Sequence, residues 1–257
     1  CCAMQGWRRR MEDAHVTDIS QGENGRFEIF GVFDGHGGKE VSNFAKNHFT
    51  KTFISNPKIK KGQIKQAIIE TYLKIDELMR QPEGKEELKQ IFNQSKMEDE
   101  IINKKLIAYN SNNKILNAQI ELNKNVLLIK EKDIASFTGC TACVCIIDNK
   151  AKKIYFANAG DSRVILCKNG TAYRMSIDHK PELELEKNRI IKANGWINEG
   201  RINGNLNLSR GFGDLEYKSN NLLRPQEQII AAYPDVIEEN MEGDEFIIIG
   251  CDGIWDC

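Results

Sequence analysis

The chain has 257 residues, 40% of them hydrophobic, and its formal net charge is −1. This length and composition are sufficient to bury a sizeable core. The near-zero charge argues against a dedicated nucleic-acid surface. No apolar run is long enough to span a membrane.

The eight cysteines do not form a recognisable zinc or disulfide pattern. Cys140 and Cys143 have the spacing of a zinc pair, but no second pair and no nearby His accompanies them. We expect the cysteines of the strand-like run 141–147 to be buried thiols. No secretion signal is visible, which favours a reducing compartment, the cytoplasm or the nucleus. Because the chain starts at Cys1, a membrane anchor upstream of it stays an open alternative.

The first strong pattern is a buried strand that ends in a carboxylate. Residues 15–19 and 27–33 read as two strands of a hairpin, joined by the turn 21–25. The second strand runs directly into Asp34-Gly35-His36. An Asp in this position can present its carboxylate, and the next glycine its carbonyl, to one hard cation. His36 can transfer a proton there, although Asp-Gly alone usually marks an ordinary turn.

Helical periodicity follows, and then a long polar stretch. Apolar spacing predicts helices over 39–54 and 62–80, both lying on a sheet face. Residues 82–133 are rich in Lys, Glu, Asn and Gln, so we interpret them as an insertion that loops out over the surface. Within this insertion a helix is expected over 86–109 and a loop over 111–114.

From residue 137 the chain is rich in short strands. Two tight turns, 148–150 and 168–170, predict hairpins and therefore antiparallel pairing. This argues against a doubly wound nucleotide-binding fold. A helix over 183–193 should end at Asn194-Gly195. The expected strands are 141–147, 153–158, 163–167, 171–174, 229–232, 236–237 and 246–250.

Three aspartates stand at the ends of predicted strands, namely Asp34, Asp161 and Asp252. Each alone would be read as a turn residue. Together with Glu12 and Asp13 they indicate a polynuclear site for Mg²⁺ or Mn²⁺, since these cations prefer oxygen ligands.

The ordered motifs resemble those of metal-dependent protein phosphatases of type 2C. The resemblance covers the whole chain apart from residues 82–133. The motifs that carry it are Met4-Gln5-Gly6-Trp7-Arg8, Met11-Glu12-Asp13-Ala14-His15, Val32-Phe33-Asp34-Gly35-His36-Gly37-Gly38, Gly139-Cys140-Thr141-Ala142, Gly160-Asp161-Ser162-Arg163, Asp178-His179-Lys180-Pro181, Asn207-Leu208-Ser209-Arg210-Gly211-Phe212-Gly213-Asp214 and Cys251-Asp252-Gly253-Ile254-Trp255-Asp256.

The resemblance implies an α+β fold, a four-layer α-β-β-α sandwich of two antiparallel sheets flanked by helices. Residues 1–257 would form a single catalytic domain, truncated at both ends. It also implies two ions of Mg²⁺ or Mn²⁺ at one end of the sandwich, with a third, weaker ion at Asp161 and Asp256.

The resemblance also assigns roles to individual residues. Asp34 would bridge two metals, Gly35 would offer its carbonyl, and Asp252 would bind the second metal. Glu12 would hold a metal-bound water. Arg8 would grip the substrate phosphate, and His36 would protonate the leaving oxygen.

The function implied is hydrolysis of phosphoserine and phosphothreonine in protein substrates by direct attack of a metal-bound water. A monomer is expected. The alternative is a catalytically weak or inactive phosphoprotein-binding scaffold of the same fold. A calcium-binding module is disfavoured because the aspartates are dispersed along the chain.

The chain departs from the family pattern in three places. The insertion replaces a shorter connection, and Asn194-Gly195 stands where a Gly-Gly pair is common. The chain stops at Cys257, before the family's final strands and last metal-binding Asp. We expect the natural protein to continue with a helix and a strand that carry an Asp, followed by Asn, for the second metal.

Overall fold

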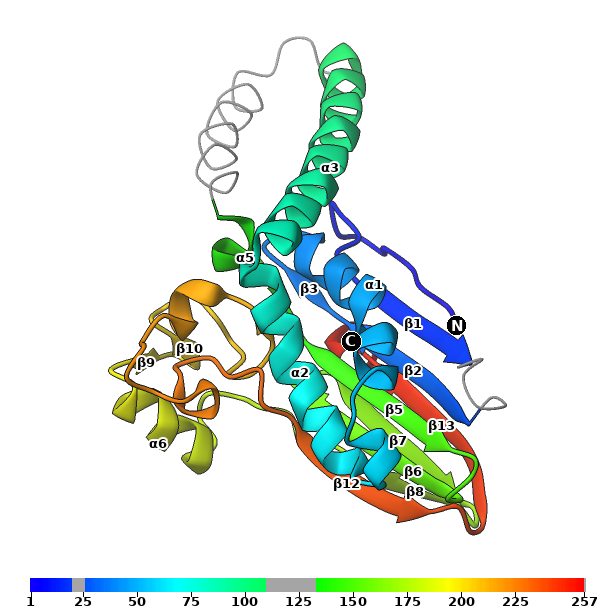
Figure 1. Ribbon diagram of the computed structural model, residues 1–257. Coiled ribbons are helices and arrows are strands. Elements are labelled where there is room, and N and C mark those ends of the chain that lie inside the picture. Colours follow the sequence, from blue (N-terminus) through cyan, green and yellow to red (C-terminus); the bar gives the residue numbers. More distant parts are fainter. Residues whose placement is uncertain (20–25, 110–132, 257) are drawn as a thin grey trace.

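A five-stranded antiparallel sheet forms the centre of the computed structural model, which describes residues 1–19, 26–109 and 133–256 (Figure 1). The strand at residues 27–33 alternates between buried and partly buried residues, so one of its faces is a core face. The neighbouring strand at residues 142–148 is buried along nearly its whole length, because both faces of the sheet are covered there. In sheet order the strands are β1 (Ala14–Ile19), β2 (Phe27–Phe33), β5 (Ala142–Asp148), β6 (Lys153–Ala159) and β12 (Asp235–Asn240).

Two helices, α1 (Glu40–Ile54) and α2 (Ile64–Arg80), cover one face of this sheet, as expected (Figure 1). Aromatic side chains from the sheet and the helices meet in this main core, with Tyr72 and Phe49 edge to face at 5.5 Å between centroids. The Tyr72 hydroxyl lies 3.0 Å from the carbonyl oxygen of Ala157, so its polar end is satisfied inside the core.

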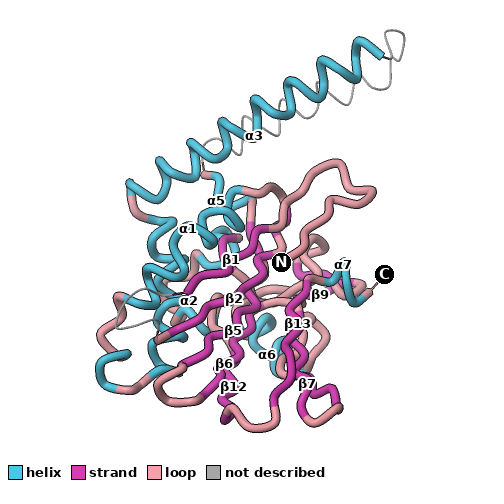
Figure 2. The backbone as a smooth tube through the Cα atoms, turned by 90° about the vertical axis from the view of Figure 1, so that its right-hand side faces the viewer, coloured by secondary structure: helices cyan, strands magenta, loops and turns pink. Residues whose placement is uncertain are grey.

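A second antiparallel sheet packs on the other face of the first (Figure 2). Its strands, in sheet order, are β13 (Asp244–Gly250), β7 (Arg163–Lys168) and β8 (Thr171–Arg174). Between the sheets lies a second core that includes Cys143, Cys145 and Phe156, so the expectation of buried thiols is confirmed. The chain passes from one sheet to the other between β6 and β7. Two packed antiparallel sheets with flanking helices confirm the predicted fold class.

Smaller elements border the strand ends. Three two-residue strands form one small sheet, in the order β11 (Phe212–Gly213), β4 (Gly139–Cys140) and β3 (Gly35–His36). Beside it, α6 (Glu184–Lys192) and the hairpin of β9 (Ile197–Asn198) and β10 (Arg201–Ile202) enclose a third core. The short helices are η1 (Ile59–Lys61), α5 (Ile134–Phe137), η2 (Leu215–Lys218), η3 (Pro225–Glu227) and α7 (Asp252–Trp255).

Two of the predicted strands differ from the structure. Residues 229–232 form only a single bridge, between Ala231 and Arg210. Ile229 and Ile230 are apolar because they pack in the third core, and Ala232 belongs to the main core. The strand expected at 236–237 extends over the whole of β12, in which Asp235 and Asn240 at the two ends are exposed and the four residues between them are partly buried.

The helix α3 (Pro82–Tyr109) starts four residues before the predicted helix, and its first turns contribute two side chains to the main core. Leu88 and Phe92, one turn apart, are both 2% exposed. Nε2 of His48 on α1 lies 2.6 Å from Oε2 of Glu87 on α3. The expectation that the whole segment from residue 82 loops out is therefore wrong for the first turns. The later turns project away from the body (Figure 1); the loop expected at 111–114 lies outside the described residues.

In the described ranges, no helix combines the length and the apolar character that crossing a membrane requires.

Candidate metal centre

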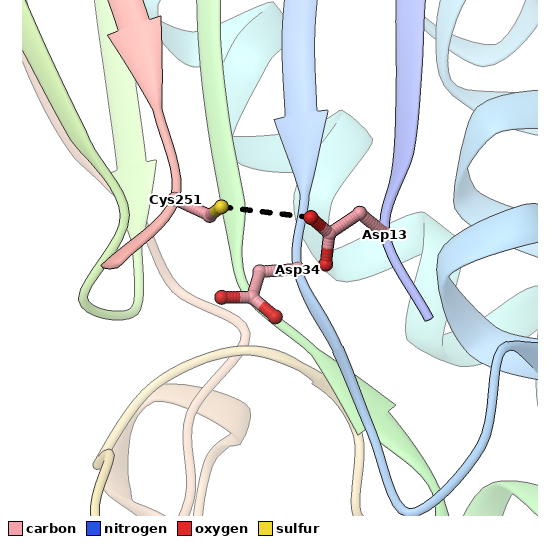
Figure 3. Close-up of side chains that lie close together, drawn as sticks. All are labelled: Asp13, Asp34 and Cys251. Carbon is pink, nitrogen blue, oxygen red and sulfur yellow. Dashed lines mark hydrogen bonds between the residues drawn. The ribbon is translucent and has the colours of Figure 1, made fainter. Parts of the chain in front are cut away.

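Antiparallel pairing gathers acidic residues at one end of the sheets. Ala14 at the start of β1 pairs with Phe33 at the end of β2, so the flanking Asp13 and Asp34 are neighbours. Cys251 follows the end of β13 and points toward them (Figure 3). The ligand atoms of these three residues all lie within 4.8 Å of one another, and the Cys251 thiol donates to Oδ2 of Asp13 at 3.5 Å.

The carboxyl group of Asp34 lies in a strongly acidic environment. Burial raises its pKa, and the charges of Asp13, Asp252 and Asp161 raise it further, to about 8. The four carboxylates come from distant parts of the sequence and repel one another in a half-buried place. A divalent cation would remove this repulsion.

The backbone at Asp34 is held by Thr141 at the start of the neighbouring strand. The amide of Asp34 donates to Oγ1 of Thr141 at 3.1 Å, and the amide of Thr141 donates to the carbonyl of Asp34 at 2.9 Å. The Thr141 hydroxyl also lies 2.7 Å from the Ser162 hydroxyl. These contacts fix the end of β2, from which the carboxylate projects.

Glycine at position 35 allows the N-terminal segment to approach closely. A Cβ at Gly35 would lie 2.3 Å from the carbonyl oxygen of Glu12. That carbonyl accepts a hydrogen bond from the Ser42 hydroxyl at 2.5 Å. The backbone of Glu12 therefore lies beside Gly35.

The two carboxylates expected at a weaker third site are paired with basic side chains. Asp161 is buried and accepts a hydrogen bond from the ammonium group of Lys180. Asp256 is 57% exposed at its side chain and lies 3.9 Å from Nη2 of Arg163. A cation at Asp161 would have to displace the ammonium group.

His36 is hydrogen-bonded to Asp214, a carboxylate to which the sequence analysis assigned no role. Its Nε2 lies 2.7 Å from Oδ2 of Asp214. Burial lowers the pKa of His36, but the charge and hydrogen bond of Asp214 outweigh this and leave it raised. A Cβ at Gly139 would lie 2.2 Å from Oδ2 of Asp214 and 2.5 Å from Nε2 of His36. A glycine at position 139 therefore makes the pair possible.

Among the described residues, the guanidinium group of Arg8 forms no ion pair with these carboxylates. Residues 1–10 are exposed. Within the described residues, Arg8 forms hydrogen bonds only through its backbone, to Gln5.

Sequence reasoning also missed Cys251 as a neighbour of Asp13 and Asp34. The available signal was its position in the sequence, because Cys251 directly follows the predicted strand 246–250 and directly precedes Asp252. For Asp214 the signal was its place at the end of a matched motif.

Comparisons with known proteins agree with this fold. The family model described as protein phosphatase 2C matches residues 1–91 and 83–257. Protein phosphatase 2C 1 of Paramecium tetraurelia is 43% identical over 256 residues, which cover 98% of this chain and 71% of the relative. A relative from Arabidopsis thaliana, described as "Probable protein phosphatase 2C 21", is 38% identical over 260 residues, covering 99% of this chain and 70% of the relative.

A solved structure described as a phosphatase from Toxoplasma gondii superposes with a TM-score of 0.67 at 21% identity, covering 97% of this chain and 74% of that one. This match supports the fold. The chain belongs to the protein phosphatase 2C family. Its enzyme class is accordingly that of a protein serine/threonine phosphatase.

Proposed function

We propose that this phosphatase requires Mg²⁺ or Mn²⁺ and hydrolyses phosphoserine and phosphothreonine in phosphorylated proteins by direct attack of water. The observation that carries the proposal is the gathering of Asp13, Asp252 and Asp161 around Asp34. Burial, and then the charges of these three neighbours, raise the pKa of Asp34 to about 8. Natural sites for hard divalent cations are rich in carboxylates, and their negative charge is tolerable because the cation offsets it.

The donors present suit such ions. The carboxylates of Asp34, Asp13 and Asp252 and the carbonyl of Gly35 would hold two ions, with Glu12 beside them. A third ion at Asp161 and Asp256 would be weaker, because Lys180 competes for Asp161. Bound ions would supply a water of lowered pKa and offset the charge of the phosphoryl group.

The other side chains act on the substrate. Asp214 accepts the Nε2–H of His36 and stabilises the doubly protonated ring, from which the Nδ1 proton passes to the leaving serine or threonine oxygen. Arg8 lies on the exposed first segment and binds two phosphate oxygens with its planar guanidinium group. No covalent phosphoenzyme forms, so no cysteine acts as a nucleophile. The monomeric state and the cytoplasmic or nuclear location stay predictions.

A metal titration with a phosphothreonine peptide tests the proposal. Turnover should require Mg²⁺ or Mn²⁺, should vanish with chelator, and should fall at least about 100-fold in Asp34→Asn. Asp18→Asn is the matched control, since Asp18 lies at the other end of β1 and accepts from Thr50. It should keep normal turnover and metal dependence.

Undiminished turnover in chelator would refute the metal requirement. Peptide binding without any metal-dependent turnover would favour the scaffold alternative.

A further inference from the structure

We propose that the buried ion pair of Asp76 and Lys218 positions Asp214 against His36. This inference rests on the proposed role of His36 as the proton donor. We refer to Asp13, Asp34, Asp161 and Asp252 as the acidic cluster. Neither Asp76 nor Lys218 contacts this cluster, so they would be positioning residues that act through Asp214.

The ion pair holds the chain on both sides of Asp214. Asp76 lies on α2, and its Oδ1 accepts the amide of Gly213 at 3.0 Å. Its Oδ2 pairs with the ammonium group of Lys218. Lys218 in turn donates to the carbonyl oxygen of Gly211 at 2.7 Å. All these groups are buried, so water does not compete for them.

The backbone at this turn requires such support. Gly213 has φ +74° and Asp214 has φ +49°, so two successive residues are left-handed. An Asp in this region is disfavoured unless surrounding contacts impose it. The amide of Asp214 donates to the carbonyl of Thr138 at 2.9 Å, which fixes one side of the turn. Asp76 fixes the other side.

The helix α2 also holds this segment at a second point. Nη2 of Arg80, at the end of α2, donates to the carbonyl oxygen of Lys218 at 3.1 Å. The turn is thus fastened to α2, which is itself packed in the main core. The direction of the Asp214 carboxylate, and with it the 2.7 Å contact to His36, follows from this attachment.

An energetic consideration favours positioning over stability as the role of the pair. Burying two charges costs nearly as much as their attraction returns, and an apolar pair of similar volume is often as stable. The contacts of this pair go to the backbone of one turn, the turn that carries Asp214. Directional hydrogen bonds can set the conformation of that turn, which apolar packing cannot do.

The test compares two substrates that differ in their need for protonation. A phosphothreonine peptide has a poor leaving group, whereas 4-nitrophenyl phosphate has a good one. His36→Ala and Asp214→Ala should lose much more on the peptide. Asp76→Asn should do the same, with a peptide loss at least about ten-fold larger than the aryl phosphate loss. In a protein that already carries Asp214→Ala, adding Asp76→Asn should not further increase the difference between the peptide loss and the aryl phosphate loss.

The control is Asp148→Asn, which removes the charge of another buried and ion-paired carboxylate. Asp148 lies 2.7 Å from Arg26, at the opposite end of the sheet. This substitution should lower the melting temperature and affect both substrates equally. If Asp76→Asn does not fold, Asp76→Glu replaces it, because that variant keeps the charge but moves the carboxylate by one methylene group.

A second readout does not depend on activity. The downfield proton resonance of the His36–Asp214 hydrogen bond, assigned with His36→Ala, should be lost in Asp76→Asn and kept in Asp148→Asn. Equal losses on both substrates with this resonance retained would overturn the inference. Absence of metal-dependent turnover in the unaltered protein would instead overturn the proposed function, and the resonance would still decide the positioning role.

Discussion

Three of the histidines that the structure describes lie within 3.1 Å of a carboxylate oxygen, and two of them make almost the same contact. His36 lies 2.7 Å from Asp214, and His48 lies 2.6 Å from Glu87. Their side chains are similarly exposed, at 25% and 30%. Only His36 stands beside the acidic cluster, two residues after Asp34. The proposed role of His36 therefore depends on its location, since the pairing alone also occurs at a surface contact between α1 and α3.

At the residue scale we predict that His36→Ala slows phosphopeptide hydrolysis by about 10²-fold or more, because a poor leaving oxygen then departs without a proton. Hydrolysis of 4-nitrophenyl phosphate should slow far less. Steady-state kinetics on both substrates at saturating Mn²⁺ measure this difference.

His48→Ala is the matched control and should leave the ratio of the two rates unchanged. Equal losses on both substrates in His36→Ala would remove His36 from the role of acid.

At the element scale, the first turns of α3 pack in the main core, whereas its later turns project away from the body. Leu88 and Phe92 are buried against α1 and α2, whereas Met97 is 66% exposed. The apolar spacing of the first turns was hidden in a stretch whose composition is polar throughout. The polar composition indicated an insertion on the surface, but the burial of Leu88 and Phe92 shows that the segment is peripheral only after these residues.

We predict that Leu88→Ala lowers the free energy of unfolding by about 2–5 kcal/mol and Phe92→Ala by about 3–5 kcal/mol, since each leaves a cavity in the core. Met97→Ala should change it by less than about 0.5 kcal/mol. Denaturant unfolding monitored by circular dichroism measures these differences. Unfolding energies unchanged in all three variants would show that α3 does not belong to the core.

At the scale of the whole molecule, the acidic cluster links stability to pH. The pKa of Asp34 is about 8 in the folded, metal-free protein, against an ordinary value of 3.8. The folded state thus holds this proton more tightly than the unfolded state. The associated stability is present at low pH and is lost as the pH rises through about 8.

The melting temperature of the metal-free protein should therefore fall from about pH 5 to about pH 8, and Asp34→Asn should reduce this fall. Added Mn²⁺ should restore stability at the higher pH, because it binds the charged cluster of the folded state. Thermal scans in chelator and in Mn²⁺ measure both effects. Parallel pH curves for the two proteins in chelator would contradict the electrostatic account of the cluster.

The sequence by itself determined the alternation of antiparallel strands and helices, because turn residues and apolar periodicity act over a few neighbouring positions. It also pointed to Asp34, Asp161 and Asp252 as strand-end carboxylates. What it could not determine was the partners of these residues, because those contacts join positions far apart in the chain. The pairing of Lys180 with Asp161, the approach of Cys251 to Asp13, and the attachment of Asp214 to α2 were decided by packing alone. The same holds for α3, where the first turns are buried because a core lies beside them.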